Sequence, residues 1–483
     1  MTRHRESIRP VIHWFRKDLR LTDNPALSRA AESGHPILAV YILEDGDSDP
    51  WAPGGASKWW LHHSLKALDQ SLKALGNGLV LRRGRPQEIL RELVTETGAT
   101  TVHCTRLTEP HAIKVESELE RILNELGAGF RASDGNLIFP PGSITTKNGE
   151  PYKVFTPFYK ACLKKLPPPA PLSAPKQLPC TKQLIRSDSL KEWKLVPEKP
   201  DWSDGWLDMW TPGEQGALSR LDSFLKRSAA AYGTERNRPD IFGTSRLSPH
   251  LHFGEISPRT CRHRSLASVR PESQDDLRSF FRQIVWREFS HHLLYHWPNF
   301  PEEPFRPEFR RFPWTRNEEG LRQWQLGLTG YPIVDAGMRE LLATGWMHNR
   351  VRMIAASFLA KHLLIPWQDG AAWFWDTLVD ADLANNSVNW QWVAGCGVDA
   401  APFFRIFNPV LQGRKFDPEG TYVRRWVPEL ANLPDRHIHQ PWDTPKDILK
   451  DSGVSLGNNY PFPVVDHITA RNRALAIFKQ IRN

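Results

Sequence analysis

Short apolar runs alternate with helical segments over the first 135 residues, and this alternation limits the possible folds more than any other feature. The strand-like runs are VIHWF, ILAVYIL, LVLRR and TTVHC, at residues 11–15, 37–43, 79–83 and 100–104. Amphipathic segments such as 57–75 and 111–126 separate them. Strands that are apolar on both faces and separated by helices form parallel sheets covered on both sides. The sequence therefore predicts a doubly wound α/β domain with a five-stranded parallel sheet over residues 1–135.

Beyond residue 213 the spacing of apolar residues changes to three and four. DDLRSFFRQIVWREFSHHLLYHW and WMHNRVRMIAASFLAKHLL both have this spacing, which is typical of amphipathic helices. Residues 213–483 are therefore expected to form an all-α domain. The intervening residues 136–212 include the run PPPAPLSAP, and proline sustains neither a helix interior nor a central strand. We interpret them as a connector on the surface.

Charge and composition narrow the classes of function. The formal net charge of +9 fits a partner that carries phosphate, although a merely solvated basic face would give the same value. The five cysteines are dispersed without a CxxC pair, which indicates free thiols and no metal site. No apolar stretch approaches the roughly 20 residues that cross a bilayer, so we expect a cytoplasmic protein without a membrane span. Neither GxGxxG nor a P-loop motif is present, which argues against a nicotinamide-dependent oxidoreductase.

Three segments of the helical half combine polar, small and aromatic residues. GTSRLSPHLHFGEIS (243–257) places hydroxyls at an expected helix start, where backbone N–H groups can bind phosphate. VDADLANNSVNWQW (379–392) places carboxylates and amides beside tryptophans, a set suited to a heteroaromatic ring with a polyol chain. WMHNRVRM (346–353) puts Asn349 and Met353 on one helical face, with Arg350 and Arg352 directed elsewhere. Each pattern also occurs as a cap or polar loop without a ligand.

Together with four longer motifs, these segments resemble the photolyase/cryptochrome family over residues 11–430. The motifs are WFRKDLRLTDNPAL, WREF, TGYPIVDAGMREL and DAAPFFRIFNP, at residues 14–27, 286–289, 329–341 and 399–409. The resemblance implies one FAD per chain, active as the fully reduced anion. It also implies light-dependent repair of cyclobutane pyrimidine dimers in UV-damaged DNA, by electron transfer from the photoexcited flavin. The protein would be a carbon–carbon lyase and a monomer that needs no protein partner.

The resemblance also assigns roles to individual residues. FAD would be bound by Tyr232, Thr244, Ser245, Arg246, Leu247, Ser248, Phe280, Arg287, Asp380, Ala381, Asp382 and Asn386, with the last of these beside N5. The family's electron-transfer triad would be Trp314, Trp367 and Trp390. Gln283, Asn349 and Met353 would be further catalytic residues. The flipped lesion and the DNA backbone would contact Arg236, Gln283, Trp286, Asn349, Arg350, Trp392, Arg405 and Gln412. Guanidinium groups suit the backbone because they are planar, charged and rich in donors.

Several positions bear on the substrate. Gln283 stands where cyclobutane-specific relatives have glutamate, and a carboxamide can neither carry a charge nor transfer a proton, so weakened repair is predicted. Phe280 stands where some relatives have tryptophan. Asn349 and Met353 replace the histidines of (6-4) photolyases, which favours a cyclobutane dimer. A (6-4) photolyase, a cryptochrome-type blue-light receptor and a non-catalytic nucleic-acid binder stay open as alternatives.

The α/β domain of this family binds a light-harvesting antenna. Glu109 and the segment GGASKWWLHHSL (54–65) resemble the folate-binding relatives, so the expected antenna is 5,10-methenyltetrahydrofolate. A deazaflavin is the alternative. The Cys–Lys pair that contacts folate in some relatives has no counterpart near residues 296–306.

Overall fold

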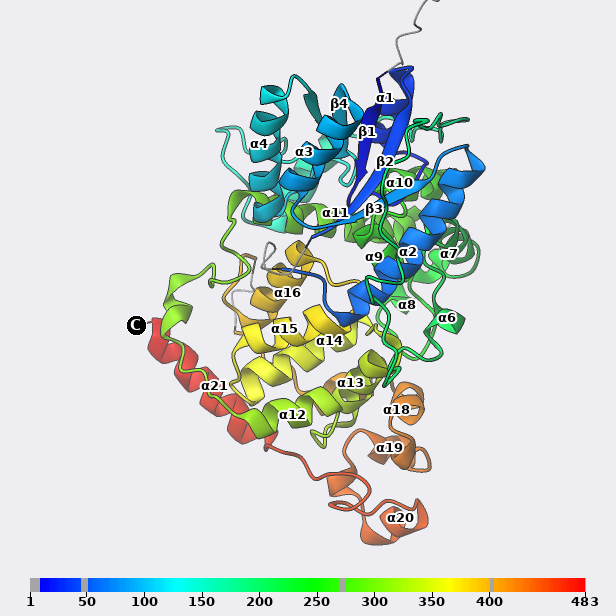
Figure 1. The fold of residues 1–483 in the computed structure, drawn as a ribbon. Coiled ribbons are helices and arrows are strands. Elements are labelled where there is room, and N and C mark those ends of the chain that lie inside the picture. Colours follow the sequence, from blue (N-terminus) through cyan, green and yellow to red (C-terminus); the bar gives the residue numbers. More distant parts are fainter. Residues whose placement is uncertain (1–8, 45–50, 269–273, 400–403, 483) are drawn as a thin grey trace, which may run out of the picture.

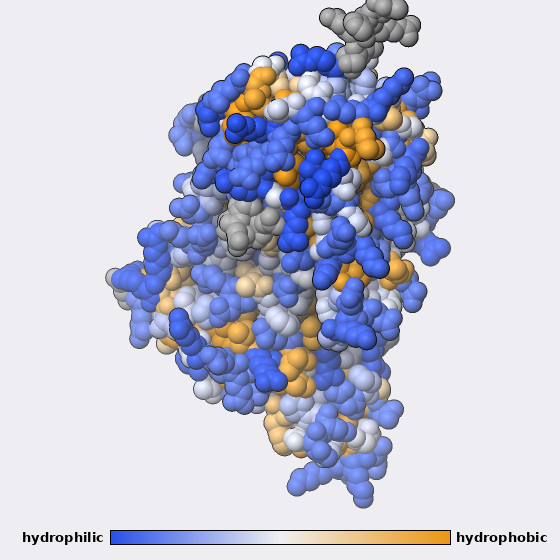
Figure 2. Space-filling model, in the orientation of Figure 1, coloured by the Kyte–Doolittle hydropathy of each residue, from blue (hydrophilic) through white to orange (hydrophobic). Residues whose placement is uncertain are grey.

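The computed structural model describes residues 9–44, 51–268, 274–399 and 404–482. In Figure 1 the α/β part lies above most of the helical part, α20 lies at the opposite end from the sheet, and α21 runs along the left side of the helical part. The face shown in Figure 2 is mostly hydrophilic, with hydrophobic side chains in separate patches. Among the described residues, no helix is long and apolar enough to span a membrane.

Five strands form one parallel sheet, as the sequence predicts, and the structure gives their order as β3-β2-β1-β4-β5. The strands are β1 (Val11–Phe15), β2 (Ile37–Leu43), β3 (Leu79–Arg83), β4 (Thr101–Thr105) and β5 (Gly129–Ser133). The connecting helices are α1 (Pro25–Glu32), α2 (Gly55–Ala74), α3 (Pro86–Thr97) and α4 (Pro110–Glu125). One core layer holds side chains of α1 and α2 and the other those of α3 and α4, so the sheet is doubly wound. Three predicted strands are confirmed to the residue, and the fourth begins one residue later than predicted.

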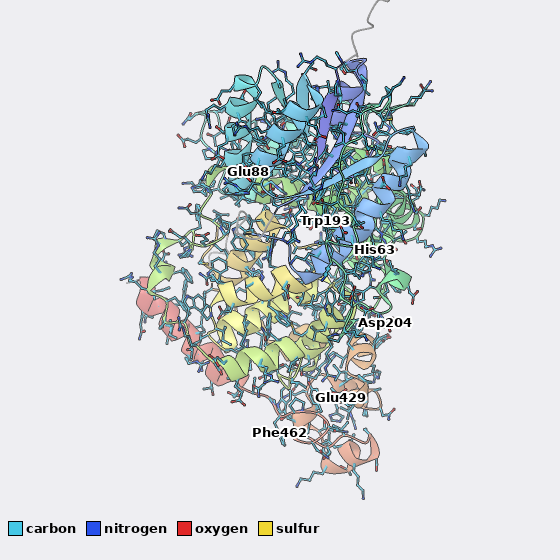
Figure 3. All side chains as sticks on the ribbon, viewed as in Figure 1. His63, Glu88, Trp193, Asp204, Glu429 and Phe462 are labelled. Atoms are coloured by element: carbon cyan, nitrogen blue, oxygen red, sulfur yellow. The ribbon has the colours of Figure 1, made fainter. Side chains whose placement is uncertain are left out.

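Residues 165–205 contain neither a helix nor a strand among the described residues, although α5 (Phe155–Lys164) precedes them and α6 (Trp206–Met209) follows. This segment runs along the sheet edge. The backbone N–H of Asp188 donates to the carbonyl of Leu81 in β3. Trp193, which is labelled in Figure 3, packs against Tyr41 of β2. The free edge of β3 is thereby covered, which protects it from pairing with another chain.

The remainder is helical, as predicted. In chain order, its first helices are α7 (Glu214–Arg227), α8 (Tyr232–Glu235), α9 (Ser248–His252), α10 (Pro258–Ala267), α11 (Gln274–His296), α12 (Glu318–Leu326) and α13 (Pro332–Thr344). The later ones are α14 (Asn349–Ser357), α15 (Trp367–Thr377), α16 (Leu383–Ala394), α17 (Pro409–Phe416), α18 (Thr421–Trp426), α19 (Asp435–Ile438), α20 (Lys446–Asp451) and α21 (His467–Arg482). Short 3₁₀ turns and one π-helical turn, η4 (Phe358–His362), complete it. Glu429 and Phe462 mark its far end (Figure 3).

The loop after β1 holds the two parts together. Buried Arg20 donates to the carbonyls of Gly254, Asp23 and Gly135, and Arg259 pairs with Asp23 at 2.6 Å. Gly254 has φ +66°, and a Cβ there would lie 1.9 Å from the carbonyl oxygen of Lys17. Only glycine allows this approach. The polar residues of the motif WFRKDLRLTDNPAL (14–27) therefore form buried hydrogen bonds and an ion pair that join the α/β part to the helical part.

Candidate functional site

An ion pair fixes the start of the 379–392 segment. The guanidinium of Arg352 in α14 donates to both carboxylate oxygens of buried Asp380, at 3.0 and 2.8 Å. Its Nε donates to the carbonyl of Met347 at 2.7 Å. The sequence placed Arg352 off the face of Asn349 and Met353 but did not predict its partner, because its long side chain reaches across to the residues that precede α16. This bidentate pairing fixes the orientation of the Asp380 carboxylate. Its oxygens keep further lone pairs that can accept hydrogen bonds from a ligand.

Asp382 is the N-cap of α16. Its carboxylate accepts from the backbone N–H of Asn385 at 2.9 Å, and His252 and His291 lie 3.4 and 3.6 Å from its other oxygen. Burial alone would raise the pKa of Asp382, but His291 and His252 hold it well below its usual range. Asp382 is therefore negatively charged at the N-terminus of α16. One turn further, the amide of Asn386 donates to the carbonyl of Ala371 at 3.0 Å, which fixes its orientation.

The hydroxyl-rich segment before α9 lines a cavity. Thr244, Ser245 and Arg246 border a space of about 820 Å³ together with residues of α2 and α7. The guanidinium of Arg246 lies between the rings of Phe242 and Trp346, at 4.8 and 4.6 Å from their centroids. Leu247 occupies the N-cap position of α9 and Ser248 its first turn, and no side chain caps this helix. The hydroxyls are therefore not used as caps.

Three other predicted cofactor residues lie around this region. Tyr232 and Phe280 are buried and meet edge to face, with centroids 5.7 Å apart. Arg287 donates to the carbonyls of Asn136 and Leu251, at 2.7 and 3.3 Å. Arg287 thus ties α11 to α9 and to the chain after β5.

The three predicted relay tryptophans lie in one core cluster. Trp390 and Trp367 are buried in it, and Trp314 is half-buried at its edge against Phe312. A Cβ at Gly370 would lie 2.1 Å from Cη2 of Trp390, so this indole rests on the backbone of α15. Trp367 begins α15 and lies one turn from Gly370 on the same face. Exposure to water therefore increases from Trp390 and Trp367 to Trp314.

Several predicted DNA-binding residues form a basic cluster. Arg236 donates to Oε1 of Gln283 at 3.0 Å, and Arg350 donates to Asn237 at 2.6 Å. Nη1 of Arg350 lies 3.9 Å from the sulfur of Met353. Burial and the nearby charges of Arg236 and Arg405 lower the pKa of Arg350, so three guanidinium groups share this region.

The remaining members of that set surround the cluster. The Arg350 guanidinium lies over Phe416 of α17, 4.5 Å from its centroid, and Gln412 is one turn before Phe416. Asn349 is exposed at the first turn of α14. The structure therefore brings together Arg236, which directly follows α8, and predicted residues of α11, α14 and α17.

Trp286 and Trp392 are linked by residues that the sequence did not single out. Trp286 stacks on Phe155 of α5, with centroids 3.5 Å apart and planes 5° apart. The indole of Trp392 donates to the carbonyl of Asp399 at 3.1 Å, and the Asp399 carboxylate accepts from the backbone N–H of Phe155 at 3.2 Å. One face of Trp286 is therefore occupied, and only the opposite face can receive a ligand.

Glu109 lies in a second cavity, of about 310 Å³, between the sheet and the helices. The cavity opens at the carboxyl ends of β1, β2 and β4, where the strand order reverses and parallel sheets bind ligands. Its walls are Trp14, Tyr41, Trp51, Trp375, Ala381 and Leu383 among others. Nζ of Lys17 lies 2.5 Å from Oε1 of Glu109. Burial alone would raise the pKa of Glu109, but the positive charge of Lys17 outweighs it and the pKa falls to about 2. The carboxylate stays ionised.

The comparisons with known proteins agree with this architecture. Residues 11–176 match a family model described as DNA photolyase, and residues 280–480 match one described as the FAD binding domain of DNA photolyase. The chain is 50% identical to a deoxyribodipyrimidine photo-lyase of Agrobacterium fabrum over 98% of both chains. It is 40% identical to cryptochrome-2 of Arabidopsis thaliana, over 95% of this chain and 77% of that one.

Two solved structures have nearly the same fold. A bacterial class III photolyase from Agrobacterium tumefaciens superposes with a TM-score of 0.96 at 50% identity, covering 100% of both chains. A Synechocystis cryptochrome superposes with a TM-score of 0.89 at 32% identity, over 97% of this chain and 99% of that one. The matched FAD-binding domain contains Asp380, Asp382 and Asn386, which supports FAD as the cofactor. The chain is therefore a member of the DNA photolyase family.

Proposed function

We propose that the protein splits cyclobutane pyrimidine dimers in DNA by light-driven electron transfer. Helix α14 carries the proposal, because its first two turns belong to two sites at once. Arg352 holds Asp380 of the expected FAD site, while Arg350 and Met353 border the basic cluster. A ligand seated on Asp380 and a base flipped into the basic cluster would lie on two sides of one helix.

The residues of the expected cofactor site fit FAD. Buried polar atoms there lack a partner within the described structure, among them Nε1 of Trp346 and Nε2 of His348. Buried polar groups of this kind need a hydrogen-bonding partner, which a ligand can supply. Asp380 offers lone pairs beyond those used by Arg352, and Asn386 presents a fixed amide. When bound and fully reduced, FAD would supply the photoexcited electron that opens the dimer, and would take it back afterwards.

The lesion site would hold the two pyrimidines by stacking and by hydrogen bonds. Trp286 offers its uncovered face, and base–aromatic stacking contributes about 1–3 kcal/mol per base. Gln283 has its oxygen bonded to Arg236, so its N–H₂ group remains as a donor toward a pyrimidine carbonyl. Arg350 and Arg405 would bind the backbone phosphates on either side.

The antenna would occupy the cavity around Glu109. Its aromatic walls suit a planar chromophore, and the ionised Glu109 can accept hydrogen bonds from ring N–H groups. We propose 5,10-methenyltetrahydrofolate there. Absorbance of the purified protein distinguishes this antenna from a deazaflavin, and Glu109→Gln should lower its occupancy while FAD is retained.

The test is repair of two oligonucleotides by the photoreduced protein under blue light. One carries a cyclobutane thymine dimer and the other a (6-4) photoproduct. Repair of the first alone supports the proposal. Repair of the second would make the protein a (6-4) photolyase. Repair of neither, with FAD bound and photoreducible, would favour a blue-light receptor, the activity suggested by its cryptochrome relatives. Size-exclusion chromatography with light scattering tests the further expectation of a monomer.

A further inference from the structure

A buried lysine holds the segment 404–408, which carries Arg405. Lys361 in η4 is 3% exposed, and its Nζ donates to the backbone carbonyl of Arg405 at 2.5 Å. Four residues earlier, the hydroxyl of Ser357 accepts from the backbone N–H of Phe407 at 3.4 Å. Two side chains of adjacent turns therefore hold the backbone of this segment at two points.

The same segment has an apolar side and a charged side. Phe404 is buried and stacks on Phe478 of α21, with centroids 4.5 Å apart and planes 10° apart. The Lys361 ammonium lies 4.3 Å from the Phe404 centroid, an attractive contact between a cation and a ring. Arg405 is exposed, and its charge acts on Arg350 of the basic cluster. Lys361 therefore fixes the backbone from which Arg405 extends toward that cluster.

The charge of Lys361 is not required for packing. No carboxylate among the described residues pairs with this ammonium, and the nearby charge of Arg405 has the same sign. Burial and, to a smaller extent, the charge of Arg405 lower the pKa of Lys361 to about 7. A buried charge without a counterion lowers stability, whereas a methionine would fill the same space without this cost. The charge therefore does not stabilise the core.

We propose that Lys361 is a positioning residue for DNA, whose ammonium holds Arg405 in place for a backbone phosphate and takes up a proton when DNA binds. The inference rests on the proposed function, which supplies DNA as the ligand. A phosphate bound to Arg405 neutralises the charge that opposes protonation of Lys361. The neutral amine then gains one proton from solvent, with no other bond made or broken. Protonation strengthens the hydrogen bond to the Arg405 carbonyl, because a charged donor binds an acceptor more strongly.

The surroundings of Lys361 leave it as the group that titrates near neutral pH. The other charged or titratable groups nearby, and on the helices that pack against η4, are Cys396, His362, Asp369, Asp376, Arg350, Arg352, His467, Arg471, Arg473, Lys479, Arg482 and the Arg306–Glu308 pair. Of these, histidines and thiols can titrate between about pH 6 and 9. Burial raises the pKa of Cys396 to about 12, lowers that of His362 to about 3 and lowers that of His467. Among the described groups here, Lys361 is therefore the one that changes charge above pH 7.

The proton uptake gives the affinity for DNA a defined dependence on pH. Protonated Lys361 favours the complex, so the affinity is highest below about pH 7 and falls as the pH rises through the higher pKa of the complex. A rise of one pKa unit on binding corresponds to a loss of about tenfold in affinity between about pH 6 and 9.

The experiment measures binding of a labelled oligonucleotide with a cyclobutane thymine dimer by the holoprotein, in the dark, between about pH 6 and 9 at fixed salt. We expect the wild type to lose about tenfold in affinity over this range. Lys361→Met should bind more weakly at the lower pH, lack this loss and retain FAD. Lys479→Met, which removes an exposed charge from α21, should keep it. The same pH dependence in Lys361→Met as in the wild type overturns the inference.

A double-mutant cycle tests whether Lys361 acts through Arg405. Lys361→Met/Arg405→Ala should bind no more weakly than Arg405→Ala alone, and additive losses overturn the inference. Calorimetry of the wild type in two buffers of different ionisation enthalpy counts the protons taken up and needs no variant to fold. Zero uptake at about pH 7.5, with lesion DNA bound, rejects the role of Lys361 alone. Absence of lesion binding at every pH rejects the proposed function as well.

Discussion

Gln283 shows how one side chain can tune a site that its neighbours position. Its oxygen is held by Arg236, and its nitrogen lies a distant 3.5 Å from the carbonyl of Ser279. A glutamate at this position would pair with the same arginine and could accept a proton from a substrate. The amide therefore preserves the geometry of the cluster while removing a charge from it.

Gln283→Glu should increase the quantum yield of dimer splitting. A hydrogen bond to a charged group is stronger than a neutral one by about 1 kcal/mol, which corresponds to about a fivefold gain in binding or rate. Repair yield per absorbed photon is measured for Gln283→Glu and for Gln283→Ala, which lacks both groups. An unchanged yield in Gln283→Glu would mean that the side chain at this position does not reach the lesion.

Arg352 is a second residue whose removal has a predictable effect. Arg352→Ala leaves the buried Asp380 without its partner, and such losses cost about 3–5 kcal/mol. Urea unfolding should report this decrease, and the purified protein should contain little FAD. Arg352→Lys retains one contact and should retain more FAD than the alanine variant. Full retention of FAD by Arg352→Ala would contradict a role for Asp380 in binding it.

At the level of secondary structure, close packing of helices sets the position of the tryptophans of the proposed relay. α15 and α16 meet at Gly370, where the Trp390 indole replaces the missing side chain. Gly370→Ala would push the indole away, at a cost of about 1–3 kcal/mol for overpacking. Flavin photoreduction should slow in this variant. Ala372→Gly, at an exposed position of the same helix, should lower stability by about 1 kcal/mol and leave photoreduction unchanged. Photoreduction at the normal rate in Gly370→Ala would argue against Trp390 as the first donor.

The sequence predicted the elements in which apolar residues recur with a clear spacing. Strand β2 is an unbroken apolar run, β1 is interrupted only by His13, and β3 begins with three apolar residues. Helices α11 and α14 have apolar residues at helical spacing. β5 reads GFRAS and has one large apolar residue, so its place was not evident from the sequence. Phe155 was missed because it lies in the expected connector, and its stack on Trp286 joins residues 131 positions apart. The contact of Arg352 with Asp380 was not predicted, because helical periodicity gives a face but not the reach of a long side chain.

The molecule as a whole contains many histidines that the fold keeps neutral. Burial lowers the pKa of His13 and His292 to about 4, and that of His348 and His362 to about 3. The unfolded chain binds protons at these groups below about pH 6.5, whereas the folded chain does not. Stability should therefore fall as the pH drops from 6.5 toward 4, since the unfolded state gains protons first.

Urea unfolding at several pH values tests this. By pH 5, one fully shifted histidine contributes a loss of about 2 kcal/mol. His362→Asn should reduce the number of protons taken up on unfolding by nearly one in this range. The slope of the free energy of unfolding against pH should decrease accordingly. A slope identical to that of the unmodified protein would show that His362 titrates normally when folded.

The first turn of α14 would link the two proposed ligands, FAD and damaged DNA, thermodynamically. Arg350 belongs to the basic cluster, and Arg352 donates hydrogen bonds to Asp380. A ligand that fixes this turn at one site would therefore also fix it for the ligand at the other site. Any such linkage is reciprocal: if FAD raises the affinity for damaged DNA by some factor, damaged DNA must slow the loss of FAD to the same thermodynamic extent. A protein short of cofactor would then be a poor lesion binder as well as an inactive one, and would leave damage accessible to loaded copies.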